Sequence, residues 1–190
     1  MPRPVEFNQK AALDSASEAF RAYGYAGLSI KMLEQETGIS SGSLYNSFGN
    51  KDRLFASVID HYNEVVVAER IREHLEIPDP SEGLISMFMS TLDEPGGGAL
   101  GCLLTNTAVE FAGANDAAVD GVSAGYGLLL DGFERALERI SVAGDHRLGA
   151  LRLLIFYQGL LVLIRHGHTK EELRAAIQTE ISSIIGVGHV

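Results

Sequence analysis

Apolar residues recur every three or four positions along almost the whole chain, which is the spacing of amphipathic α-helices. No stretch sustains the strict alternation of apolar and polar residues that marks a half-buried strand. The first periodic segment spans about residues 9–23, with Leu13, Ala16 and Phe20 on one face and Gly24 at the stop position. The pattern predicts an all-α fold of about nine helices.

Capping residues divide the next part of the chain into a helical hairpin and a long helix. Ser29 can cap a helix that ends at Gly38, and Ser40 can cap a short helix after it. Asn50 can cap a long helix, rich in apolar residues at helical spacing, that ends near Pro78. Two helices joined by a three-residue turn are therefore expected ahead of the long one.

Five further helices are predicted in the rest of the chain, separated by turns rich in Gly, Pro and Asp. Residues 78–81 form a turn with an N-cap, and residues 94–98, Glu-Pro-Gly-Gly-Gly, give the strongest loop signal. The last helix begins with a capping box formed by Thr169 and Glu172. The expected helices are one from residue 81 through residue 92 and then about 101–112, 116–140, 145–166 and 170–185.

Composition favours a soluble cytoplasmic protein. The chain has 190 residues, of which 46% are hydrophobic, enough to bury a core without metal or disulfide support. Its most apolar run, residues 153–164, is too short to cross a membrane as a helix. The one cysteine, Cys102, cannot form an internal disulfide or a Cys-pair metal site, which excludes disulfide scaffolds and zinc ribbons.

The net charge of −10 does not by itself exclude nucleic-acid binding, because the charge is unevenly distributed. Residues 1–56 hold six basic and six acidic residues. Residues 57–190 hold nine basic and nineteen acidic residues and thus carry the entire excess. The first segment can therefore approach phosphate while the second repels it.

The most informative stretch is residues 28–55, a capped helix, a turn led by Gly38 and a short helix rich in small hydroxyl side chains. Small residues allow the axis of such a helix to approach base edges in the DNA major groove. The polar groups available on it are Ser41, Ser43, Tyr45 and Asn46. Taken alone, such a hairpin is more often part of a larger helical bundle than a DNA-binding element.

The pattern S-S-G-S-L-Y-N-S-F-G-N-K follows A-x-x-x-F-x-x-Y-G-Y at one helix's distance, and together they resemble the N-terminal domain of TetR-family regulators. The resemblance covers about residues 9–56 and extends more weakly to GCLLTNTAVEF and GLLVLIRHGHTKEELRAAI. It implies a helix-turn-helix domain at residues 1–56 and a ligand-sensing and dimerisation domain at residues 57–190. It also implies a transcriptional repressor that binds a double-stranded, near-palindromic operator and uses no cofactor.

The resemblance also implies roles for individual residues. Tyr45 would reach a phosphate, Lys51 would hold another at the start of the long helix, and Ser29 would cap its helix beside the DNA backbone. Glu36 departs from the family pattern, which has a small residue there, so we expect its side chain to face solvent. The predicted DNA-binding set is Ser29, Ser41, Gly42, Ser43, Tyr45, Asn46 and Lys51, with Ser41, Ser43 and Asn46 as base readers.

The last two helices are expected to form the homodimer interface. An apolar stripe on the first of them would pair with its symmetry mate in a four-helix bundle, with small Gly159 beside it. A small-molecule inducer would bind the second domain and favour a dimer whose recognition helices are misspaced for DNA. The predicted stripe is Leu151, Leu154, Ile155, Gln158, Leu161, Val162 and Arg165, and the predicted inducer-binding residues are Met87, Phe88, Cys102, Asn106, Phe111, Tyr126, Phe133 and Tyr157.

Three alternatives remain open from the sequence. Cys102 follows Gly101 at an expected helix start, where a thiol can become reactive and sense electrophiles or oxidants, although a buried cysteine would be inert. A helical adaptor that does not bind DNA is a second alternative. An enzyme is not expected, because the chain has no nucleophile elbow, no phosphate-binding loop after a strand and no H-E-x-x-H motif.

Overall fold

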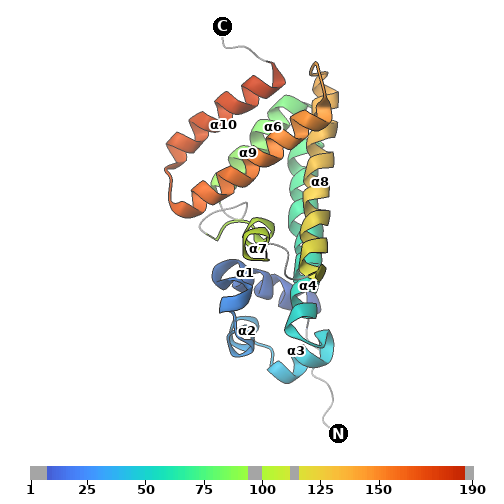
Figure 1. Cartoon of the computed structure of the whole chain (residues 1–190), viewed down its shortest axis with the longest axis vertical. Coiled ribbons are helices and arrows are strands. Elements are labelled where there is room, and N and C mark those ends of the chain that lie inside the picture. Colours follow the sequence, from blue (N-terminus) through green and yellow to red (C-terminus); the bar gives the residue numbers. More distant parts are fainter. Residues whose placement is uncertain (1–7, 94–99, 112–115, 187–190) are drawn as a thin grey trace.

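The computed structural model describes residues 8–93, 100–111 and 116–186, and every regular element within these ranges is a helix (Figure 1), which confirms the all-α prediction. The predicted loop at 94–98 lies outside the described residues. The helices are α1 (Gln9–Gly27), α2 (Ile30–Thr37), α3 (Ser41–Phe48), α4 (Lys51–Tyr62), α5 (Ala68–Arg70), α6 (Pro80–Met89), α7 (Leu103–Phe111), α8 (Asp116–Ile140), α9 (His146–His166) and α10 (Lys170–Ile185).

The predicted caps hold the small N-terminal helices in place. The hydroxyl oxygen of Ser29 accepts a hydrogen bond from Met32 N (3.2 Å), and that of Ser40 accepts one from Ser43 N (3.2 Å). The Asn50 side chain caps α4 in the same way, so all three predicted N-caps are confirmed. Gly24, with φ of 71°, interrupts α1 three residues before its end.

A continuous helical rod starts with α4 and connects the two halves of the molecule. It passes through a π-helical stretch (Asn63–Val67), the short α5 and a second π-helical stretch (Ile71–Leu75). Counted as one, this rod brings the described helices to nine. The predicted domain boundary at residue 56 lies within α4, so both predicted parts share the rod.

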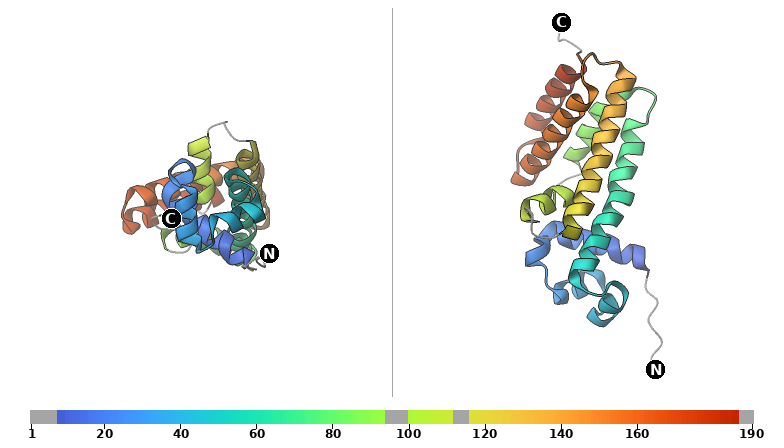
Figure 2. Two further views of the ribbon diagram at one scale, coloured as in Figure 1. Left: turned by 90° about the horizontal axis from the view of Figure 1, so that it is seen from below. Right: turned by 45° about the vertical axis from the view of Figure 1, so that its right-hand side comes forward.

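The rod runs alongside α8, as the two views in Figure 2 and the packing of their side chains show. The Asn63 side-chain amide donates a hydrogen bond to Gly121 O (2.8 Å), which ties the two helices together. At the far end of the rod, Arg139 on α8 donates to Leu75 O (2.8 Å) and so caps its last turn. The α8 helix also packs on α9, and α10 packs on α6 and α9.

Candidate nucleic-acid interface and ligand cavity

Helix α3 lies at the end of the molecule opposite α10, with one face packed and the other open (Figure 1). Leu44 and Phe48 are buried against the neighbouring helices and anchor it. Gly42, Tyr45 and Asn46, at i, i+3 and i+4, are exposed on another face. This face of α3 therefore presents one small residue, one phenol and one carboxamide to whatever approaches the tip of the molecule.

Nothing in the fold requires glycine at position 42. A Cβ built there would meet only the Ser40 hydroxyl oxygen, at 4.0 Å. The protein's own packing therefore does not require glycine here, and the lack of a side chain leaves room for an outside surface to come close to the α3 backbone.

Of the predicted base readers, Ser41 and Ser43 are half-buried, and the Ser43 hydroxyl lies 3.0 Å from that of Ser40.

Lys51 begins α4, but its side chain folds back onto the end of α1. Its Nζ donates to Tyr25 O (2.5 Å) and lies 4.2 Å from the centre of the Tyr25 ring. Burial lowers the pKa of Lys51, and the carboxylates of Glu110 and Asp52 partly oppose that shift. To reach a phosphate with its ammonium group, Lys51 has to leave this position.

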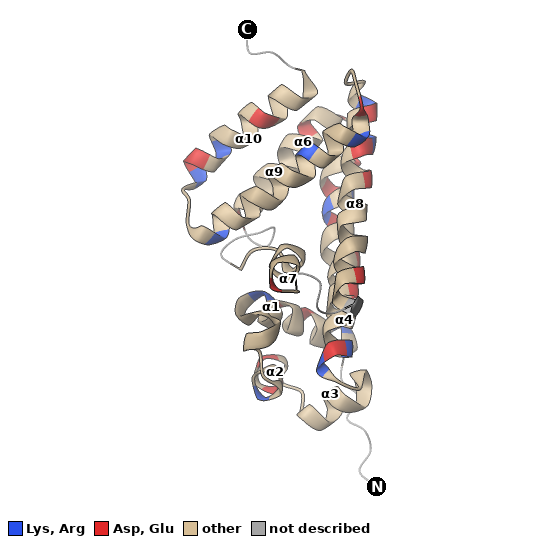
Figure 3. Cartoon of the chain, viewed as in Figure 1, with Lys and Arg blue, Asp and Glu red and all other residues tan. Residues whose placement is uncertain are grey.

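Exposed basic residues lie on either side of α3. The helix itself carries no charged residue, and Figure 3 shows Lys and Arg on α2 and at the start of α4. Lys31 and Arg53 are both exposed, whereas Lys51 is half-buried. Sequence reasoning assigned phosphate contacts to Tyr45 and Lys51 and did not consider Lys31 and Arg53, although each lies near the start of a capped helix.

Glu36 faces solvent, as predicted. Its side chain is exposed, and its carboxylate accepts a hydrogen bond from the Tyr23 hydroxyl (3.3 Å). Because this residue is not buried, its charge does not strain the hairpin formed by α2 and α3. Ser29, which caps α2, is likewise exposed.

A carboxylate on α7 holds the last residues of α1, after the interruption at Gly24. Glu110 accepts hydrogen bonds from Tyr25 N (2.8 Å) and Ala26 N (2.7 Å), one on each oxygen. The Tyr25 ring packs between Phe55 and Phe111, with ring centres 5.0 and 4.9 Å apart. The sequence contained no local signal for this contact, because its partners are more than eighty residues apart.

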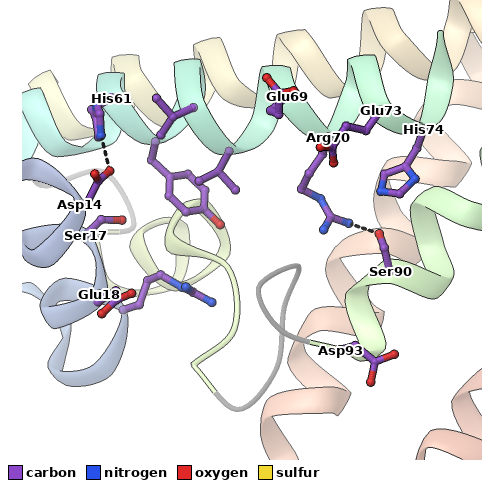
Figure 4. A pocket seen from close by; sticks show the side chains of 14 residues that line it. Asp14, Ser17, Glu18, His61, Glu69, Arg70, Glu73, His74, Ser90 and Asp93 are labelled. Carbon is purple, nitrogen blue, oxygen red and sulfur yellow. Dashed lines mark hydrogen bonds and ion pairs between the residues drawn. The ribbon is translucent and has the colours of Figure 1, made fainter. Parts of the chain in front are cut away.

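A cavity of about 530 Å³ lies between α1 and the rod (Figure 4). Its size falls in the range typical of small-molecule sites. Residues of α1, of the rod from the end of α4 through its second π-helical stretch, and of the segment after α6 surround it. The lining residues are Asp14, Ser17, Glu18, Arg21, His61, Tyr62, Val65, Val66, Glu69, Arg70, Glu73, His74, Ser90 and Asp93.

Comparison with known proteins first gives matches to the N-terminal part of the chain. The family model described as bacterial regulatory proteins, tetR family, matches residues 12–58. The HTH-type transcriptional regulator YezE of Bacillus subtilis is 32% identical over 113 residues, which cover 58% of this chain and 58% of YezE. The HTH-type transcriptional repressor ComR of Escherichia coli is 42% identical over 60 residues, which cover 32% of this chain and 29% of ComR. The aligned regions thus leave out a large part of both relatives.

Solved structures extend the similarity to nearly the whole chain. A cysteine mutant of the TetR family transcriptional regulator CifR, complexed with 26bp double-strand operator DNA, matches with a TM-score of 0.82 and 25% identity over 96% of this chain and 99% of CifR. Residues 12–58 thus match the TetR family, and the described part of the chain has the fold of TetR-family regulators. Reduced NemR of Escherichia coli shows the same fold. It matches with a TM-score of 0.83 and 17% identity over 96% of this chain and 98% of NemR.

The residues predicted to bind an inducer do not gather in one site, and none of them lines the 530 Å³ cavity. Met87, Phe88 and Phe133 are fully buried, and Tyr157 packs edge-on against Phe88 with ring centres 5.5 Å apart. These four fill the core of the second domain. Phe111 belongs to the aromatic cluster around Tyr25 instead.

The other three predicted inducer residues lie nearer the surface. Cys102 and Asn106 line a separate cavity of about 430 Å³, and Tyr126 lines a groove across α7, α8 and α9. Side-chain type alone could not separate core-filling aromatic residues from residues that line a cavity. Only the packing of the helices makes that distinction.

Cys102 directly precedes α7, as predicted for a helix start, but its sulfur is buried. The residue is 7% exposed, and the Tyr62 hydroxyl donates a hydrogen bond to its Sγ (3.6 Å). A buried thiol in this position has little access to electrophiles or oxidants. The thiol-sensing alternative is therefore not favoured.

Helix α9 presents an apolar face that the chain itself leaves uncovered. By length and composition α9 is the one described helix that could cross a membrane, yet only 33% of its apolar window is buried. Leu154 and Leu161, which the sequence placed on this face, are 7% and 1% exposed and point into the subunit core, so that part of the stripe was wrong. The exposed apolar residues of α9 are Leu148, Leu151, Ile155, Val162 and Leu163.

Proposed function

We propose that this chain is a homodimeric, ligand-responsive transcriptional repressor. The observation that carries the proposal is the open face of α3, where Gly42, Tyr45 and Asn46 project from a rigid, capped helical hairpin. The complex of CifR with operator DNA supports the same use of the fold. The named relatives are an HTH-type transcriptional regulator and an HTH-type transcriptional repressor, and in this proposal the protein acts on DNA in the cytoplasm without enzyme activity.

Helix α3 enters the major groove of double-stranded DNA in this proposal. Asn46 reads a base edge, since its carboxamide can both donate and accept, and Tyr45 contacts a phosphate with its hydroxyl. Ser41 and Ser43, which are half-buried, contribute at the edge of the groove, and Ser29 lies beside the DNA backbone. Exposed Lys31 and Arg53 join Lys51 in neutralising phosphates.

The uncovered face of α9 is the dimer interface in this proposal, together with α10. Gly159 lies on that face, and a Cβ there would meet nothing within 4 Å, so a second helix can approach closely. Val109, 77% exposed, extends the apolar surface across the neighbouring groove. A two-fold dimer reads two half-sites of a near-palindromic operator.

An inducer bound in the cavity beside α1 and the rod would link the two domains directly. The walls of the cavity belong to α1, which packs on α2 and α4 within the DNA-binding part, and to the middle of the rod. A ligand that fits the cavity only when α1 and the rod move apart would shift the dimer toward a form whose α3 helices are misspaced.

Selection of bound duplexes from a random library, followed by gel shift, tests the function. We expect a near-palindromic consensus bound by wild type and no longer bound by the double variant Tyr45→Ala, Asn46→Ala. The exposed control Ser47→Ala, on the same helix, should retain binding. A pool without any enriched sequence would instead indicate a helical adaptor that does not bind DNA.

A further inference from the structure

We propose that the cavity between α1 and the rod binds a small organic carboxylate, with Arg70 as the residue that neutralises its charge. This rests on the ligand-responsive function proposed above and names the chemical class of the ligand. The cavity carries a buried guanidinium group on one wall and apolar side chains on another. Neither the family model nor the relatives assign such a site to this chain.

Among the residues that the structure describes, Arg70 is a buried cation without an ion-pair partner. It is 8% exposed, and no Asp or Glu oxygen of the described residues lies within 4.0 Å of its guanidinium group. Its NH2 donates to Met87 O (3.1 Å) and to Ser90 Oγ (2.9 Å), both uncharged, while its Nε has no hydrogen-bond partner. Burial of an uncompensated charge is costly, so an anion is the partner that this site lacks.

The carboxylates at the rim of the cavity are largely occupied. Asp14 pairs with His61, Glu69 pairs with Arg72, and Asp93 pairs with Lys170. Glu18 and Glu73 are exposed, so their charges are screened by solvent. The wall formed by Arg70 therefore attracts an anion despite the acidic residues around the entrance.

The electrostatic effect of Arg70 is visible at its neighbour His74. Burial lowers the pKa of His74, and the positive charge of Arg70 lowers it further. Figure 4 shows both side chains extending from the rod, with Arg70 reaching toward Ser90. A neutral His74 leaves the positive charge of Arg70 available to a ligand.

The apolar part of the ligand is accommodated by Val65 and Val66, which are half-buried and line the same cavity. Both lie in the first π-helical stretch of the rod, and Glu73 and His74 lie in the second. Such stretches are rare and occur frequently at functional sites, because they redirect side chains that a regular helix would orient differently. A monocarboxylic acid with a short apolar body matches this arrangement.

The test compares hexanoate and benzoate with their uncharged amides on the full-length dimer. We expect millimolar hexanoate or benzoate to raise Tm by about 3 °C or more near saturation, and hexanamide and benzamide to leave it unchanged. Arg70→Met should abolish the difference and Arg70→Lys should retain part of it. The control Arg72→Gln, an exposed cation two residues away, should behave as wild type.

Equal effects of acid and amide on wild type would overturn the proposal, as would an acid effect that persists in Arg70→Met. If Arg70→Met does not fold, the NMR signal of His74 in wild type decides. Acid but not amide should raise the pKa of His74, and an unchanged titration would contradict the site. Gel shifts distinguish the two proposals. If the protein binds its operator but the acids have no effect, only the proposed carboxylate site is contradicted. If the acids bind but the protein does not bind DNA, only the repressor function is contradicted.

Discussion

The Glu110 carboxylate on α7 accepts a hydrogen bond from the backbone N–H of Tyr25 (2.8 Å), eighty-five positions earlier in the chain. Its other oxygen accepts from Ala26 N (2.7 Å), so one side chain of the second domain fixes the turn that ends α1. The carbonyl and ring of Tyr25 in turn hold the Lys51 ammonium group. A displacement of α7 is thereby transmitted to the start of α4, beside the proposed DNA-binding face.

Glu110→Gln is expected to weaken both the fold and operator binding. The carboxamide retains one acceptor but turns an NH2 group toward a backbone N–H, which costs about 1 kcal/mol at this exposed position. Urea unfolding and operator affinity measure the two effects. Glu64→Gln, also exposed, is the control. Unchanged urea midpoint and affinity would show that α7 does not hold the turn.

Gly42→Ala should separate DNA binding from stability. A methyl group there meets only open space, and alanine is the better helix former, so the free energy of unfolding should rise by up to about 1 kcal/mol. Operator affinity should nevertheless fall at least tenfold, because the methyl group occupies the space between α3 and the DNA. Gly127→Ala on α8, also in open space, controls for helix propensity. Operator affinity equal to that of wild type would exclude a close approach at Gly42.

Lys51→Ala and Arg53→Ala compare a cation held by the protein with one exposed at the same helix start. Each phosphate that a variant no longer neutralises should reduce the slope of log K against log salt by about 1 per subunit. We expect that reduction for both variants. Arg53→Ala should leave stability near wild type, whereas Lys51→Ala should also loosen the turn at Tyr25. An unchanged slope for either variant would remove that side chain from the interface.

Ile155→Glu should dissociate the dimer. Ile155 is 64% exposed on the uncovered face of α9, so the subunit itself tolerates the charge, but the interface would bury it twice at a cost of several kcal/mol. Sedimentation should show a monomer at micromolar concentration with an unchanged helical spectrum. Leu128→Glu, an exposed apolar position on α8, should remain dimeric. A stable Ile155→Glu dimer would place the interface elsewhere.

His74 should make the protein less stable as pH falls. Its folded-state pKa is lowered from 6.5 by burial and by Arg70, so below pH 6.5 the unfolded chain binds a proton that the folded chain resists. The free energy of unfolding should therefore decrease from pH 7 to pH 5, and His74→Gln should show a smaller decrease. Urea unfolding of both proteins across that range measures it, with His166→Gln, an exposed site, as the control. An identical pH dependence in His74→Gln would contradict the lowered pKa.

Local chemistry was sufficient to predict the helices and the hairpin. Ser29, Ser40, Asn50 and Thr169 each accept a hydrogen bond from the backbone amide three residues later, so their caps could be recognised without knowledge of the fold. The exposure of Glu36 followed in the same way, because a charged residue on a short helix is rarely buried without a partner.

Only the tertiary structure decided how those helices pack and which of their faces are buried. Periodicity placed Leu161 on an apolar stripe but could not tell whether the core or a second subunit would cover it, and the packing of α9 turned it inward. The same limit applies to the predicted inducer residues, since Phe88 and Phe133 fill the core while charged Arg70 lines the cavity. A cap depends on neighbours in sequence, whereas a cavity depends on where helices far apart in sequence fail to meet.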